Sequence, residues 1–153
     1  MLRKEVILPV KIYTTTHLIR PEYINHHGTL YTGKSVDWMV EAAFNAVAME
    51  HGIPDELLCL KIEEMTFMQP VEAGDILIVS STVAQASGSS IVMHVEATTQ
   101  MSRVSCVEGY ITFVTWDSRT RTSKPHRICL DEAADARESE IRARAAKFKY
   151  KQP

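Results

Sequence analysis

Asn25-His26-His27-Gly28-Thr29-Leu30-Tyr31-Thr32-Gly33 is a turn-rich segment that leads directly into a run of helical periodicity. In that run, residues 34–51, apolar residues recur at the i, i+3, i+4 and i+7 positions of one helix face, and Gly52 and Pro54 end it. A glycine-bearing turn before a helix lets backbone N–H groups and the positive helix end face whatever lies in front of them. This junction therefore predicts a place where a carbonyl oxygen or an anion binds.

The other core segments are predicted to be β-strands. Their residues are rich in β-branched and aromatic side chains, and glycine- or proline-containing turns separate most of them. The spacing of the last three predicts an antiparallel meander. From residue 131 the chain is charged and rich in alanine, which predicts a C-terminal helix. The predicted strands are residues 5–16, 57–67, 76–86, 91–101 and 105–116.

One long helix and about five antiparallel strands predict an α+β fold, in which a curved sheet wraps around the helix and buries its apolar stripe. We assign residues 1–128 to this domain and residues 129–153 to a charged helical tail. A single curved sheet leaves edge strands that need cover, so self-association is expected.

Composition excludes several classes of function. The net charge of −2 gives no electrostatic case for binding nucleic acid or an acidic membrane. No apolar run approaches the roughly 18 residues that a membrane span needs, and the first residues do not resemble a signal peptide. The three cysteines are far apart and form no CxxC pair, so buried free thiols in the cytoplasm are expected.

Three motifs, in order, resemble the hotdog-fold acyl-CoA thioesterase superfamily. The first is Asn25 to Gly28 followed by Tyr31-Thr32-Gly33 at the helix entry. The second is the block from Thr66-Phe67 through Pro70-Val71 to Gly74-Asp75, and the third is Gly88-Ser89-Ser90. The resemblance covers roughly residues 5–118 and implies a hotdog fold, an acyl-CoA substrate and no separate cofactor. It also implies a homodimer, or a tetramer or hexamer built from dimers, with sites at the subunit interfaces.

Thioester hydrolysis needs a group that polarises the carbonyl and a carboxylate that acts as nucleophile or as general base. By resemblance, the polarising groups are the backbone amides of Thr32 and Gly33, and Asn25 orients the carbonyl or the attacking water. An Asx turn at Asn25 is the alternative. The family's carboxylate falls at Val40, which cannot act as a base, so Glu41 is the candidate and Asp37 the second choice.

Four further residues are candidates for contacts with coenzyme A. His27 is expected to line the acyl or pantetheine channel, and Gly88, Ser89 and Ser90 to contact the pyrophosphate, although a hairpin turn explains these three equally well. The adjacent histidines have no carboxylate at ligand spacing, so no metal site is expected.

These features predict an acyl-CoA thioesterase. Two alternatives stay open. A non-hydrolytic acyl-CoA binder or regulator on the same fold is consistent with Val40. An acyl-CoA lyase or hydratase uses the same polarised carbonyl, although the sequence has no Asp-x-x-x-x-His signature.

Overall fold

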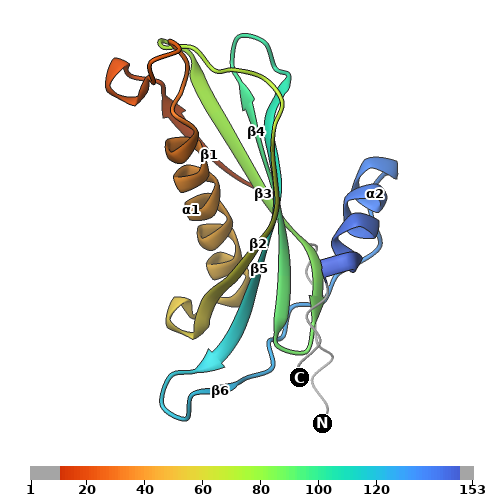
Figure 1. Ribbon diagram of the computed structural model, residues 1–153. Helices are drawn as coiled ribbons and strands as arrows, with labels where there is room; N and C mark the ends of the chain where they lie inside the picture. The colour runs from red at the N-terminus through yellow and green to blue at the C-terminus, as the bar shows by residue number, and fades with distance from the viewer. Residues whose placement is uncertain (1–10, 149–153) are drawn as a thin grey trace.

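The computed structural model describes residues 11–148, and in this range a curled antiparallel sheet forms a half-barrel with one helix on each side (Figure 1). Three short 3₁₀ turns accompany these elements: η1 (Pro21–Tyr23), η2 (Pro54–Glu56) and η3 (Ala146–Phe148). The strands are β1 (Tyr13–Leu18), β2 (Leu57–Phe67), β3 (Ile76–Ser87), β4 (Ser90–Thr99), β5 (Ser105–Asp117) and β6 (Thr122–Ser123), and the helices are α1 (Thr32–His51) and α2 (Ala136–Ala145).

The strand order is β1-β3-β4-β5-β2, with the two-residue β6 paired to β5. Strands β3, β4 and β5 form the predicted meander, and β1 and β2 form the two edges. The predicted hotdog fold, with its C-terminal helix, is confirmed.

The core lies between α1 and the concave face of the sheet. Met39, Ala43, Ala46 and Val47 are fully buried on one face of α1, against strand residues such as Phe113. The small alanines bring the helix axis close to the sheet. Each fully buried large apolar side chain contributes roughly 1.5–3 kcal/mol.

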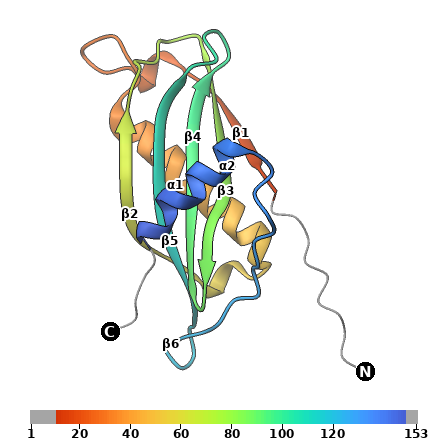
Figure 2. The same ribbon diagram turned by 90° about the vertical axis from the view of Figure 1, so that its right-hand side faces the viewer.

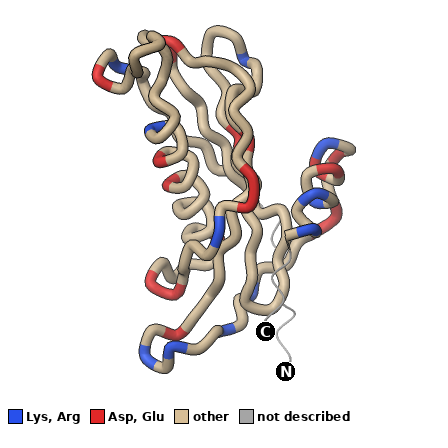
Figure 3. The backbone as a smooth tube through the Cα atoms, in the orientation of Figure 1, with Lys and Arg blue, Asp and Glu red and all other residues tan. Residues whose placement is uncertain are grey.

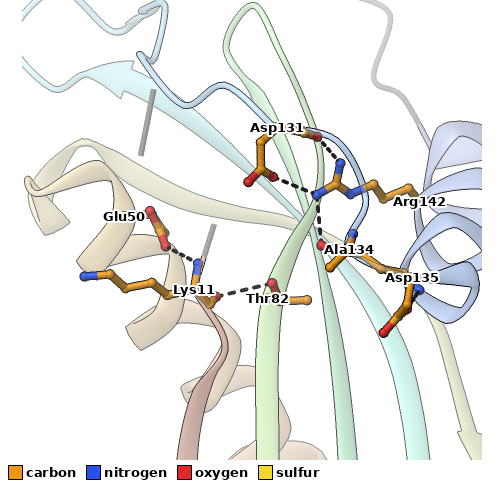
Figure 4. Close-up of polar contacts among 8 residues, drawn as sticks. Lys11, Glu50, Thr82, Asp131, Ala134, Asp135 and Arg142 are labelled. Atoms are coloured by element: carbon orange, nitrogen blue, oxygen red, sulfur yellow. Dashed lines mark hydrogen bonds and ion pairs between the residues drawn. The ribbon is translucent and has the colours of Figure 1, made fainter. Parts of the chain in front are cut away.

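Several predicted boundaries differ from the structure, most of them by one or two residues. Helix α1 begins at Thr32 instead of residue 34, and β1 continues through His17 and Leu18 instead of ending at residue 16. Strand β1 extends because His17 pairs with Leu77 and Leu18 with Ile76, a long-range contact that local sequence does not reveal. Two hydrogen bonds hold the backbone just before β1: the Lys11 N–H donates to Glu50 (3.2 Å), and the Thr82 hydroxyl donates to the Lys11 carbonyl (Figure 4). Residues 5–10 of the predicted strand lie outside the described residues.

Helix α2 crosses the convex face of the sheet, opposite α1 (Figure 2). Asp135 caps its first turn by accepting the Glu138 N–H, and Arg142 reaches back to the carbonyl and carboxylate of Asp131 (Figure 4). Its many charged residues (Figure 3) include Arg144, which pairs with Glu64 at 3.0 Å. Only a narrow apolar stripe, centred on Ala145, packs against the sheet.

Candidate functional site

A pocket of about 230 Å³ lies at the end of the molecule where α1 begins, at the top of Figure 1. The turn before α1, the first turn of α1, the connection from β2 to β3 and the start of β5 meet there. The lining residues come from these four segments: Asn25, Thr29, Leu30, Thr32, Ser35, Phe67, Met68, Gln69, Pro70, Val71 and Val107.

The N-terminus of α1 is left open toward this pocket. Its N-cap, Tyr31, makes no side-chain capping bond, and the first turn has no acidic residue. The Lys34 and Ser35 N–H groups both donate to the Tyr31 carbonyl, whereas those of Thr32 and Gly33 find no acceptor within residues 11–148. Since Thr32 lines the pocket, its free N–H and the positive helix end are available to a ligand oxygen there.

Asn25 forms the Asx turn that the sequence left as an alternative. Its Oδ1 accepts the backbone N–H groups of His27 (2.9 Å) and Thr29 (3.2 Å), and Gly28 takes a left-handed φ of 81° to close the turn. The two backbone donors identify Oδ1 as the acceptor, which makes Nδ2 the donor group of this side chain. This Nδ2 group has no acceptor among the described residues. Asn25 lines the pocket, so the turn and a donor role are compatible.

No carboxylate of the described chain lines the pocket. Val40 is half-buried against the core, and Glu41 is exposed on the helix surface. Asp37 is exposed too and accepts from Lys34 Nζ at 3.4 Å. Within one chain, the structure therefore brings Asn25 and Thr32 together and leaves Glu41 outside.

His17, which lies just beyond the predicted end of the first strand, stacks on Trp38 with ring centroids 4.3 Å apart. Lys34 lies over Trp38 at 5.3 Å and over Tyr23 at 5.1 Å. Burial lowers the pKa of His17, the charge of Glu41 opposes this shift, and Lys34 adds to it. This aromatic cluster on the β1 side of α1 supports the first turns of the helix beside the pocket.

The candidate contacts for coenzyme A lie outside the pocket in this chain. His27 is exposed, and its ring lies 3.9 Å from that of His26. Gly88, Ser89 and Ser90 turn the hairpin between β3 and β4, roughly 35–40 Å along β3 from the pocket end. Within the described residues, no group of three or more His, Cys, Asp or Glu side chains is placed to hold a metal ion.

Sequence reasoning missed most of the lining. Thr29 and Leu30 lie within the first motif and Ser35 follows it, whereas Phe67 to Val71 belong to the second motif. Both motifs therefore held a signal that these segments share one end of the fold. Val107 carried no such signal, because only the pairing of Phe67 with Val107 between β2 and β5 brings it there.

A family model of the thioesterase superfamily matches residues 27–106, slightly more than half of the chain. The chain belongs to the thioesterase superfamily. In this superfamily member, the matched region includes α1, the connection from β2 to β3 and the meander up to the start of β5. No curated relative matches the sequence.

Solved structures resemble this thioesterase-superfamily chain in fold at low identity. Acyl-CoA hydrolase from Staphylococcus aureus is 21% identical over 89% of this chain and 80% of its own, with a TM-score of 0.77. The Bacillus cereus acyl-CoA hydrolase is 20% identical over 90% and 83%, with a TM-score of 0.78. A hexameric thioesterase from Yersinia pestis is 19% identical over 73% and 92%, with a TM-score of 0.66. No helix within residues 11–148 of this superfamily member is long and apolar enough to span a membrane.

Proposed function

We propose that this protein is an acyl-CoA thioesterase, which hydrolyses an acyl-CoA to the free acid and coenzyme A. One observation carries the proposal: two donors without acceptors among the described residues, the Thr32 N–H and Asn25 Nδ2, border the same uncharged pocket. Fixed donors in a site sheltered from water stabilise the oxyanion that forms when a thioester is attacked.

The reaction follows from these donors. The thioester carbonyl oxygen accepts from the Thr32 and Gly33 amides, and Asn25 Nδ2 donates to the carbonyl or holds the attacking water. A carboxylate takes one proton from that water while the water oxygen bonds to the carbonyl carbon. The tetrahedral intermediate then breaks its C–S bond, and coenzyme A leaves as a thiolate that is protonated on release.

The carboxylate is proposed to come from a second copy of the chain. β2 is an edge strand with exposed apolar side chains, among them Leu58, Ile62 and Phe67. Pairing two β2 edges antiparallel would cover them and place both α1 helices on one face of a continuous sheet. Glu41, or Asp37, of the partner subunit's helix would then act at this pocket. That the Yersinia pestis relative is hexameric supports self-association.

Val40 supports the second candidate, a binder of acyl-CoA without turnover. Solved structures of the Staphylococcus aureus enzyme include alanine variants of an Asn and of an Asp fifteen positions further along. Fifteen positions also separate Asn25 from Val40 in this chain. If the two positions correspond, a valine stands here in place of that Asp.

The test is release of free thiol from a panel of acyl-CoAs by the wild type, Glu41→Gln and Asp37→Asn. Glu132→Gln is the matched control, because Glu132 is an exposed carboxylate on the segment before α2. We expect turnover in the wild type and the control and its loss in Glu41→Gln. If only Asp37→Asn is inactive, the base is Asp37 instead.

Two other outcomes would contradict hydrolysis. Tight binding of an acyl-CoA by calorimetry without thiol release would establish the binder. A change at an enoyl chromophore without thiol release would indicate addition or elimination at the acyl chain.

A further inference from the structure

The pocket wall is uncharged at every lining position. Its inner part is closed by residues that are almost fully buried: Leu30, Ser35, Val71 and Val107 are between 3% and 7% exposed. The one hydroxyl among them, Ser35 Oγ, already donates to the Thr32 carbonyl at 2.8 Å. The inner wall therefore offers apolar contact and no spare hydroxyl donor.

Two of the charged residues near the lining segments, Lys34 and Asp75, are engaged elsewhere. Lys34, between Thr32 and Ser35, pairs with Asp37 and lies over Tyr23. Asp75, at the end of the β2–β3 connection, accepts the backbone N–H groups of Ile76 (2.7 Å) and Met101 (3.4 Å). A carboxylate or ammonium at the far end of an acyl group would leave water without a counter-charge, which proteins tolerate poorly.

The volume sets how much of the acyl group the pocket of one chain encloses. A cavity of about 150 Å³ takes benzene, so about 230 Å³ takes roughly nine non-hydrogen atoms. The carbonyl carbon, its oxygen and the sulfur occupy part of this volume, which leaves space for about six further carbons.

We infer that the acyl group is neutral and short, with about four to eight carbons. This inference rests on the proposed function, because it assumes that the thioester carbonyl sits at Thr32 and Asn25. It excludes dicarboxylic and amino-acyl thioesters, and long fatty acyl thioesters, as good substrates.

The test compares kcat/KM for straight-chain acyl-CoAs from acetyl to palmitoyl, and for butyryl-CoA against succinyl-CoA, which differ by a terminal carboxylate. We expect the maximum near hexanoyl, at least a tenfold lower value for palmitoyl, and at least a hundredfold lower value for succinyl than for butyryl. A maximum at palmitoyl, or succinyl within tenfold of butyryl, would overturn the inference.

A first variant enlarges the pocket. Val107→Ala removes two methyl groups from the wall and should move the maximum toward longer chains by one or two carbons. Val114→Ala is the matched control, because the same change on the same strand lies outside the lining. An unchanged maximum in a folded Val107→Ala protein would contradict the assigned wall.

A second variant supplies the missing counter-charge at the exposed rim, where folding is not at stake. Gln69→Lys should raise the ratio of succinyl to butyryl turnover at least tenfold, and Gln100→Lys, an exposed glutamine outside the lining, should leave it unchanged. Equal ratios in both variants would place the acyl group elsewhere.

Failure of the proposed function has a different signature. If no acyl-CoA releases thiol, hydrolysis fails, and the same pair of ligands is compared by calorimetry. Butyryl-CoA binding at least tenfold more tightly than succinyl-CoA would then uphold the neutral acyl pocket. Equal affinities would overturn it as well.

Discussion

The two ends of α1 are built in opposite ways. At its C-terminus, Gly52 takes a left-handed φ of 87°, its N–H donates to the Ala48 carbonyl at 2.8 Å, and His51 in the last turn contacts Glu56 at 2.8 Å. At its N-terminus, no side chain caps the helix, and the amides of Thr32 and Gly33 have no acceptor among the described residues. The C-terminal end of α1, which only has to be stable, is closed by these contacts, and the N-terminal end, which faces the pocket, is open.

The largest effect is expected at the open end, where Thr32→Pro should lower kcat/KM by about a hundredfold or more. Proline is tolerated at the first helical position, and Tyr31 before it has φ −60° and ψ 125°, the extended backbone that precedes proline. The change therefore deletes one unbonded N–H with little effect on the fold. Thr32→Val, which keeps the N–H, is the control, and equal activity of the two variants would refute the amide's role.

Asn25→Asp should have the next largest effect, a loss of roughly tenfold to a hundredfold in turnover. Aspartate keeps the oxygen that accepts from His27 and Thr29, so the turn survives, but it lacks the Nδ2 donor. Acyl-CoA assays with melting curves check this. Asn45→Asp on the exposed face of α1 is the matched control, and a melting point that falls in parallel with activity would mean that Asn25 is only structural.

At the closed end, Gly52→Ala should destabilise the protein by roughly 1–2 kcal/mol, the cost of a left-handed backbone for a residue with a Cβ. Urea unfolding measures this change. Turnover should be unaffected, because Gly52 lies outside the pocket lining. A loss of activity without a loss of stability would contradict the assignment of stability to the closed end and of activity to the open end.

A smaller effect on stability is expected from His126, which makes the stability of the protein depend on pH. Its Nδ1 accepts the Ile128 N–H (3.2 Å), so the ring is neutral and Nε2 donates to the Ser90 carbonyl (2.9 Å). Burial lowers its pKa below the usual 6.5, the bond to Ser90 opposes this, and the charge of His51 lowers it further. Between that lowered pKa and 6.5 the unfolded chain binds more protons, so the stability from this site is complete above pH 6.5 and declines as pH falls.

Urea unfolding at pH 7.5, 6.5 and 5.5 checks this dependence. We expect His126→Gln to flatten the loss of stability toward acid pH, and His27→Gln, the same change in the exposed turn, to leave it as in the wild type. Identical slopes for His126→Gln and the wild type would remove His126 from the account.

Gly33→Ala at the open end should have the smallest effect on stability, within about 0.5 kcal/mol. The three atoms nearest to an added Cβ belong to the Tyr31 ring, with Cε1 at 2.5 Å, and this exposed ring can turn away. Comparison with Gly52→Ala by urea unfolding therefore separates a glycine needed for its backbone from one that is not. An equal loss of stability in both variants would contradict this difference.

Local sequence predicted the elements whose signal is local. The apolar periodicity of residues 34–51 predicted α1, but Tyr31 is not a typical N-cap, so the first two helical residues were missed. The strands of the meander were predicted within a few residues. Gly88 marks the turn between β3 and β4, whereas the turn between β4 and β5 has no glycine, and the predicted strand 91–101 ran two residues past the end of β4. The end of β1 was not, since pairing of His17 and Leu18 with β3 decides it.

The site divides along the same line. Asn25 and Thr32 are close in sequence, and the structure brings both to the pocket. Val107 lies at the pocket because β5 pairs with β2, a long-range contact that the sequence around Val107 does not predict. The role of Glu41 depends on a second chain, and a contact between copies leaves no periodicity in one sequence; the assignment of Glu41 therefore stays a prediction.

The stack of His17 on Trp38 makes the protein its own optical probe. An indole pressed against an imidazole is quenched to a degree that changes when the imidazole gains a proton or moves, and Trp38 adjoins the helix turns that border the pocket. With Trp116→Phe, Trp38 becomes the single tryptophan emitter of the chain. Its fluorescence would then report ligand entry in real time, with no label attached to the substrate.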